Sequence, residues 1–170
     1  MSVSYTPANW NRPIEEFTFS RRHLPHLEIP GGYYFTTSCT KFRRVLTPAD
    51  RDIVLGAILF MDGKKYQLDA AVVMPDHFHT ILHPLQKNGS ADDGSAAADY
   101  SLREIFHSIK SYTANKIGGR VWQDENHDHL IRDEKDYLEK LQYILYNPVK
   151  AELVASPREY PWLYWIGWGT

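Results

Sequence analysis

Apolar and polar residues alternate along some segments, as in strands, and recur every three to four residues along others, as in helices. The first such segments predict a strand followed by a helix. Residues 33–40 (YYFTTSCT) are rich in aromatic and β-branched side chains, which favour a strand. Thr47 followed by Pro48 is typical of a helix start, because a threonine can cap the first turn and a proline fits the first helical position. The sequence therefore predicts a helix that continues over residues 49–60.

Two strands are predicted after this helix. Asp62-Gly63 is a turn signal, and residues 66–74 read as a strand. Pro75-Asp76 should then turn the chain into a returning strand over residues 77–83, paired beside the first.

A second helix is expected after a polar stretch. Residues 86–99 (QKNGSADDGSAAAD) are small and polar with no apolar period, which favours a flexible surface loop. Ser101 can cap the helix, and Gly118-Gly119 should end it. The apolar residues at helical spacing between them are Leu102, Ile105, Phe106, Ile109, Tyr112 and Ile117.

The last elements complete the predicted fold class. Residues 121–131 should contain a strand, Asp133 can cap a final helix reaching about Asn147, and Pro148 is expected to end it. The order of strands and helices resembles an α+β, ferredoxin-like (RRM-like) antiparallel sheet with helices on one face, plus a C-terminal helix.

The organisation along the chain suggests one domain with two flanking segments. The polar, aperiodic residues 1–30 are interpreted as an N-terminal extension, residues 31–155 as the domain and residues 156–170 as an aromatic tail. Three tryptophans recur at three-residue intervals in this tail: Trp162, Trp165 and Trp168. Core packing is the favoured role for them, and a cover over a DNA groove is the alternative.

Composition narrows the class of protein. The 170 residues match a single domain, and Cys39 is the one cysteine, so no disulfide framework is expected. The N-terminus lacks the build of a signal peptide, and the longest apolar run, residues 53–61, is too short to span a membrane. These features predict a cytoplasmic protein without a membrane partner.

Charge is distributed unevenly although the formal net charge is only −2. A generally basic nucleic-acid binder is therefore not indicated. Basic residues nevertheless gather early in the chain, which allows a local phosphate-binding face, although on charge alone a solvated surface is favoured. The candidate DNA-binding residues are Arg21, Arg22, Lys41, Arg43 and Arg44.

A histidine pair stands in the predicted strand within VVMPDHFHTILHP (residues 72–84). Side chains two apart on a strand share a face, so His77 and His79 should project together while Phe78 enters the core. Two neutral imidazoles so placed can share a metal such as manganese, zinc, iron or nickel, whereas magnesium prefers oxygen ligands. On spacing alone, two partly exposed histidines with hydrogen-bond partners are favoured. A second pair, His127 and His129, is interpreted as strand surface or as support for a site.

The last predicted helix offers further polar groups. Its apolar stripe should be buried and consists of Tyr137, Leu138, Leu141, Ile144 and Leu145. Tyr143 lies off this stripe, and Glu139, Tyr143 and Asn147 follow one another at four-residue spacing on a different face. Because Asn147 precedes Pro148, its backbone should leave the helical region and free the side chain at the helix end.

The combination of His-aromatic-His on a strand and Tyr-x-x-x-Asn on a late helix resembles the HUH single-tyrosine transposases. Within them, the chain looks like the REP-associated tyrosine transposases, where REP stands for repetitive extragenic palindromic. The resemblance extends from about Arg21 to Val154. It rests on RRHLPHLEIPGGYYFTT, VVMPDHFHTIL, SIKSYTANKI, VWQDENHDHLIRD and YILYNPVKAELV.

The resemblance implies a site and an activity. His77, His79 and Asn147 match the ligands of a divalent metal, Mg²⁺ or Mn²⁺, and Tyr143 matches the nucleophile. Tyr112 on the earlier helix is interpreted as a packing or DNA-contacting residue. The implied reaction is cleavage and rejoining of single-stranded DNA at hairpins through a 5'-phosphotyrosine, by a monomer or a homodimer.

Two other functions compete with this reading. One is a non-catalytic regulator that binds DNA hairpins and derives from a transposase. The other is a small hydrolase that depends on a metal or on histidine. No histidine is followed two residues later by the Thr or Ser of a two-histidine phosphoesterase, and one cysteine cannot supply the Cys-x-x-Cys of a zinc deaminase.

Overall fold

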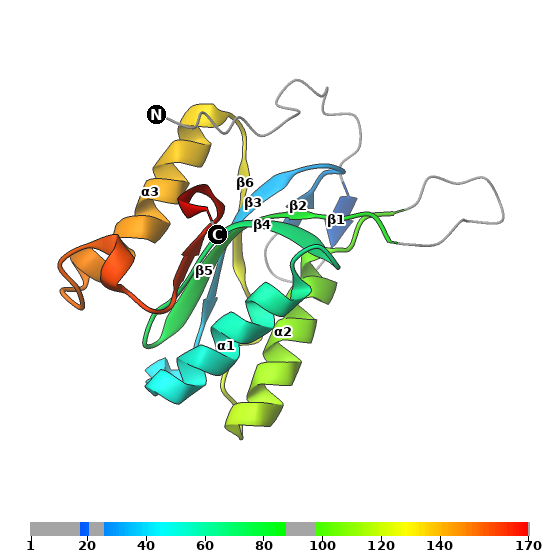
Figure 1. The fold of residues 1–170 in the computed structure, drawn as a ribbon. Helices are drawn as coiled ribbons and strands as arrows, with labels where there is room; N and C mark the ends of the chain where they lie inside the picture. The colour runs from blue at the N-terminus through cyan, green and yellow to red at the C-terminus, as the bar shows by residue number, and fades with distance from the viewer. Residues whose placement is uncertain (1–17, 21–25, 88–97, 170) are drawn as a thin grey trace.

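The computed structural model describes residues 18–20, 26–87 and 98–169 (Figure 1). Its helices and strands, in chain order, are β1 (Thr18–Ser20), β2 (His26–Glu28), β3 (Tyr33–Cys39), α1 (Pro48–Met61), β4 (Tyr66–Val73), β5 (His77–Pro84), α2 (Leu102–Ile117), β6 (His127–Ile131), α3 (Glu134–Lys150) and β7 (Leu163–Trp165). Short 3₁₀ turns lie at Lys41–Arg43, Pro157–Glu159 and Ile166–Trp168. No helix among the described residues has the length and apolarity needed to cross a membrane.

The main sheet has five strands in the order β6-β3-β5-β4-β7, and every neighbouring pair is antiparallel. The four strands β6-β3-β5-β4, with α1 after β3 and α2 after β5, have the connectivity of a ferredoxin-like sheet. The expected α+β, antiparallel fold class is therefore confirmed. β1 and β2 form a separate two-stranded sheet.

The helix starts follow from local capping. The Thr47 side chain accepts a hydrogen bond from the Asp50 backbone amide, and Ser101 does the same for Glu104. Each N3 carboxylate in turn accepts from the backbone amide of its capping residue, so both helices begin with a capping box. Asp133 caps α3 through the Asp136 amide. All three predicted caps are confirmed.

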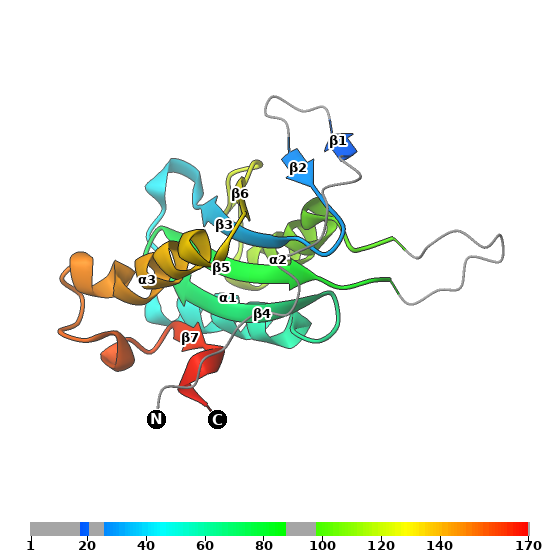
Figure 2. The same ribbon diagram turned by 90° about the horizontal axis from the view of Figure 1, so that it is seen from above.

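The helices cover opposite faces of the sheet. Figure 2 shows α3 on one side of the strands and α1 with α2 on the other. Phe78 packs among residues of α1 and α2 in one core cluster, whereas Ile81 packs with residues of α3 in a second cluster. Two cores on one sheet mean that alternate residues of each central strand face different helices.

α3 continues past the proline that was expected to end it, so that prediction is wrong. Pro148 lies inside the helix, and the Ala151 amide donates to the Asn147 carbonyl across it at 3.0 Å. A proline this close to the end removes a single backbone hydrogen bond, and the buried Pro148 ring adds packing. The Asn147 backbone is consequently helical. Leu138, expected in the buried stripe, is 54% exposed.

The C-terminal residues add to the sheet. β7 pairs with β4, and the side chains of Trp162, Trp165 and Trp168 pack against the core clusters. Core packing, the favoured role of these tryptophans, is therefore what the structure shows. Most of the predicted N-terminal extension lies outside the described residues, as does most of the predicted loop 86–99. The division into extension, domain and tail remains a prediction.

A buried carboxylate connects α3 to the sheet. The pairing of β4 with β5 shifts register between Leu68 and Ala70, so Asp69 is an extra residue in the strand. Asp69 is fully buried; one carboxylate oxygen accepts a hydrogen bond from the Tyr137 hydroxyl at 2.8 Å, and the other has no partner. Burial is the main cause that raises the pKa of Asp69 to about 6, while the Tyr137 hydrogen bond acts against it.

We predict that Asp69→Asn changes how stability depends on pH. Because the pKa of Asp69 is raised in the folded state, its unfavourable contribution appears as the pH rises from about 4 through about 6. The free energy of unfolding of the variant relative to the parent should rise by about 2 kcal/mol between pH 4 and 7.5. Urea unfolding at several pH values measures this difference. Asp124→Asn, which alters an exposed carboxylate, should give no such trend, and a flat difference for Asp69→Asn would contradict the prediction.

Candidate active site

β5 presents its histidine pair to the α3 side of the sheet. The rings of His77 and His79 lie with centroids 4.7 Å apart, and Phe78 between them is fully buried in the opposite core. The geometry expected from the two-residue period of a strand is therefore present. It places two imidazoles side by side next to the final helix.

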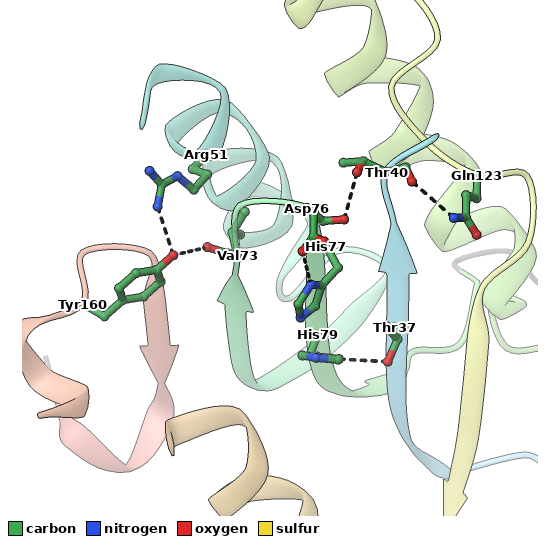
Figure 3. Close-up of polar contacts among 9 residues, drawn as sticks. All are labelled: Thr37, Thr40, Arg51, Val73, Asp76, His77, His79, Gln123 and Tyr160. Carbon is green, nitrogen blue, oxygen red and sulfur yellow. Dashed lines mark hydrogen bonds and ion pairs between the residues drawn. The ribbon is translucent and has the colours of Figure 1, made fainter. Parts of the chain in front are cut away.

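His79 is fixed by the neighbouring strand and has one unoccupied ring nitrogen. Thr37 on β3 is its cross-strand partner, and the Thr37 hydroxyl hydrogen-bonds His79 Nδ1 at 2.8 Å (Figure 3). The side chain of His79 is almost fully buried, and its Nε2 has no hydrogen-bond partner. Burial, with a further effect from His77, lowers the pKa of His79 to about 3. The ring is therefore neutral at physiological pH and has a nitrogen available as a ligand.

His77 is oriented by the turn that precedes β5. Its Nδ1 lies 2.7 Å from the Asp76 carboxylate. The Asp76 carbonyl accepts hydrogen bonds from both the Thr40 amide, at 2.8 Å, and the Thr40 hydroxyl, at 3.0 Å (Figure 3). Contacts of this kind at Nδ1 fix a ring and direct Nε2 toward a ligand.

Tyr143 on α3 lies against His79, the second histidine of the pair. Its ring centroid lies 5.1 Å from that of His79 and 5.8 Å from that of Phe35 on β3. The ring is 43% exposed, so a substrate can reach it. Tyr143 is thus the tyrosine that the structure brings to the histidine pair. Tyr112 on α2 lies on the helical layer of the opposite face and is 51% exposed.

A pocket of about 200 Å³ lies between α3 and the sheet at this point. Its walls are Phe35, Thr37, His79, Glu139, Lys140 and Tyr143. The Lys150 ammonium lies 5.8 Å from the Tyr143 ring centroid. The pocket therefore combines a neutral imidazole, a phenol and one carboxylate with nearby cations.

Three residues near the pocket were not found by sequence reasoning. Thr37 could have been inferred only from the register of β3 against β5, which the sequence does not specify. Lys140 is three residues before Tyr143 and Lys150 seven residues after it, so both follow helical spacing. That spacing was the signal available for the two lysines.

Asn147 is one helical turn beyond Tyr143 on α3 and is half-buried. Among the described residues, no group of three or more His, Cys, Asp and Glu side chains is placed to hold a metal ion. A site made of His77, His79 and Asn147 would take its third donor from an amide oxygen. The unpartnered, buried Nε2 of His79 fits such a site, because a buried polar atom normally has a partner.

The second histidine pair has a different role. His129 on β6 makes hydrogen bonds of 2.7 and 3.0 Å to the Asp136 carboxylate in the first turn of α3. His127 is exposed. His129 thus ties the start of α3 to the sheet.

The candidate DNA-binding residues divide into two groups. Arg21 and Arg22 lie outside the described residues. Lys41, Arg43 and Arg44 lie in the turn that follows β3. Lys41 is 3.8 Å from Asp124, and the Arg44 guanidinium donates to the Gly118 carbonyl at 2.9 Å. The structure therefore brings three of the five cations together in one turn.

Comparisons with known proteins agree on one family. No protein-family model matches the sequence. A provisionally named REP-associated tyrosine transposase of Haemophilus influenzae is 31% identical over 105 residues, which cover 57% of this chain and 57% of the relative. The chain thus matches little more than half the length of that relative. The REP-associated tyrosine transposase of Escherichia coli is 29% identical over 136 residues, covering 78% of this chain and 76% of the relative.

A solved structure supports the same assignment. It shows a REP-associated tyrosine transposase bound to a REP hairpin and matches with a TM-score of 0.67 and 26% identity. The match covers 86% of this chain and 81% of that one. By sequence and by fold, the chain is similar to the REP-associated tyrosine transposases.

Proposed function

We propose that this protein cleaves and rejoins single-stranded DNA at hairpins of repetitive palindromic elements, through a 5'-phosphotyrosine on Tyr143 and with a divalent metal. The observation that carries the proposal is the placement of an exposed phenol against a buried imidazole. The Tyr143 and His79 ring centroids are 5.1 Å apart, and His79 Nε2 has no partner within the protein.

The metal-binding part of the proposal assigns His77, His79 and Asn147 as ligands of Mg²⁺ or Mn²⁺. When bound, the ion would polarise the scissile phosphate and stabilise charge in the transition state. The protein prepares the ligands beforehand, since Asp76 and Thr37 hold the two rings at Nδ1. The low pKa of His79 keeps its ring neutral, as a metal ligand must be.

The nucleophilic step belongs to Tyr143. Its phenolic oxygen forms a bond to phosphorus, the bond from phosphorus to the 3' oxygen breaks, and that oxygen leaves as a hydroxyl after taking up a proton. The phenolic proton is lost to the solvent that reaches the exposed ring. Attack of a 3' hydroxyl on the phosphotyrosine reverses the step. One phosphodiester replaces another, so no nucleotide hydrolysis is required.

Cations near the pocket would hold the DNA backbone during this exchange. Lys140 lines the pocket, and Lys150 lies beside the Tyr143 ring. Both come from the helix that carries the nucleophile, so they approach the same phosphate region. Contacts of this type are electrostatic and do not depend on sequence.

The choice of a hairpin as substrate is supported by the solved relative, which is bound to a REP hairpin. The competing function, a regulator that binds hairpins without cleaving them, shares the fold and the DNA. It differs in that Tyr143 would have no chemical role. Cleavage assays therefore separate the two functions.

We predict that Tyr143→Phe abolishes strand cleavage while hairpin binding is kept. The substitution removes the attacking oxygen and leaves the ring that packs against His79 and Phe35. Labelled single-stranded hairpins taken from around the gene, incubated with Mn²⁺, should yield a covalent adduct with the parent protein at Tyr143 by peptide mass. The variant should yield none.

Tyr146→Phe is the matched control, because Tyr146 is on the same helix and is similarly exposed, at 44%. It should leave adduct formation unchanged. An adduct formed by Tyr143→Phe would exclude Tyr143 as the nucleophile. Hairpin binding by the parent protein with no adduct would instead favour the regulator.

We predict that His79→Ala removes Mn²⁺ binding measured by isothermal titration calorimetry in the absence of DNA. The buried His79 Nε2 is the atom assigned to the metal, and it has no hydrogen-bond partner among the described residues. His107→Ala removes an exposed histidine on α2 and should leave Mn²⁺ affinity unchanged. Equal Mn²⁺ affinity for the parent and His79→Ala would rule out the assigned site.

A further inference from the structure

An exposed aromatic ring projects from the turn after β3. Phe42 is 95% exposed, the highest value among the exposed large hydrophobic side chains of the described residues. Its neighbours Lys41, Arg43 and Arg44 are all basic. An isolated exposed apolar residue needs no explanation, but a fully exposed phenylalanine among three cations forms a distinct surface.

The turn holds this ring outward in an unusual backbone conformation. Phe42 and Arg43 both have φ of 53°, in the left-handed region that bulky side chains rarely adopt. Strain of this kind persists only where the surrounding structure enforces it, and it is concentrated at functional sites. The backbone is thus set so that Phe42 points into solvent rather than into the core.

Both ends of the turn are anchored. Lys41 donates its backbone amide to the Val121 carbonyl at 2.7 Å, and the Arg44 amide closes the turn on the Lys41 carbonyl at 3.0 Å. The Leu46 side chain is buried, and its amide donates to the Pro75 carbonyl at 2.6 Å. Phe42 is therefore exposed on a supported turn and not on a loose loop.

The anchors connect the turn directly to the candidate active site. Thr40 and Leu46, which flank the turn, bond the carbonyls of Asp76 and Pro75, the two residues before His77. Figure 3 shows Thr40 against Asp76, with His77 and His79 below them. The chain from Thr37 to Phe42 spans at most about 18 Å. A single strand whose phosphate lies at the pocket can therefore also reach Phe42.

We propose that Phe42 is a stacking platform for an unpaired base of the DNA strand that enters the active site, with Arg43 and its basic neighbours on the adjoining phosphates. The inference rests on the proposed function, because it requires single-stranded DNA as the substrate. A flat ring among cations matches a nucleotide, which offers a flat base and an anionic phosphate. An apolar protein partner would not need three flanking charges.

The test compares affinities for two DNA hairpins of identical stem, one blunt and one with an unpaired flank, using the full chain. Phe42→Ala should weaken binding of the flanked hairpin by about tenfold, since it removes stacking on one base, and leave binding of the blunt hairpin unchanged. Phe42→Tyr should restore affinity, whereas Phe42→Leu, which keeps the apolar bulk, should not. Thermal unfolding verifies that each variant is folded.

Three other outcomes would contradict either the stacking role of Phe42 or the proposed function. Equal affinity of Phe42→Ala and the parent protein for the flanked hairpin would overturn the stacking role while leaving the proposed function intact. Full recovery by Phe42→Leu, or an effect on self-association in place of DNA affinity, would overturn it in favour of an apolar contact. Failure of the parent protein to bind either hairpin would instead refute the proposed function.

Discussion

The two-residue period of β5 between two helical layers is the constraint on which the site depends. Phe78 must enter the core beneath α1 and α2, so His77 and His79 must face α3. A one-residue slip of β5 would turn both histidines into the apolar core beneath α1 and α2 and would turn Phe78 toward α3. The buried packing of Phe78 therefore determines which face of the sheet His77 and His79 occupy.

The position of α3 relative to this strand depends on two polar contacts outside the pocket. His129 bonds Asp136 in the first turn of the helix, and the Tyr137 hydroxyl bonds Asp69 in the bulge of β4. Both contacts involve residues of α3 that lie about two helical turns before Tyr143. They therefore hold the N-terminal half of the helix against the sheet. Asp69 remains partly unsatisfied in the core, which is unfavourable for stability. The same carboxylate nevertheless joins α3 to β4 through its hydrogen bond with Tyr137.

Local signals predicted much of the fold, whereas features that depend on pairing between distant segments were not accessible. Thr47, Ser101 and Asp133 cap helices through contacts within three residues, which a sequence shows directly. Thr37 reaches His79 only through strand register, and β7 joins β4 across more than ninety residues, so neither could be read from a local pattern. Pro148 misled because its usual helix-ending effect is weak in a last turn whose proline ring is buried.

The C-terminal segment supports the site although its tryptophans do not line the pocket. The Tyr160 hydroxyl donates to the Val73 carbonyl at 2.9 Å and accepts from Arg51 of α1 at 3.1 Å (Figure 3). Arg51 also stacks on Trp162, whose carbonyl accepts the Val73 amide. These contacts fasten the end of β4 to α1 immediately before the turn that carries Asp76. That turn orients His77 and also anchors the segment that bears Phe42, so the contacts of the tail help to hold both side chains in place.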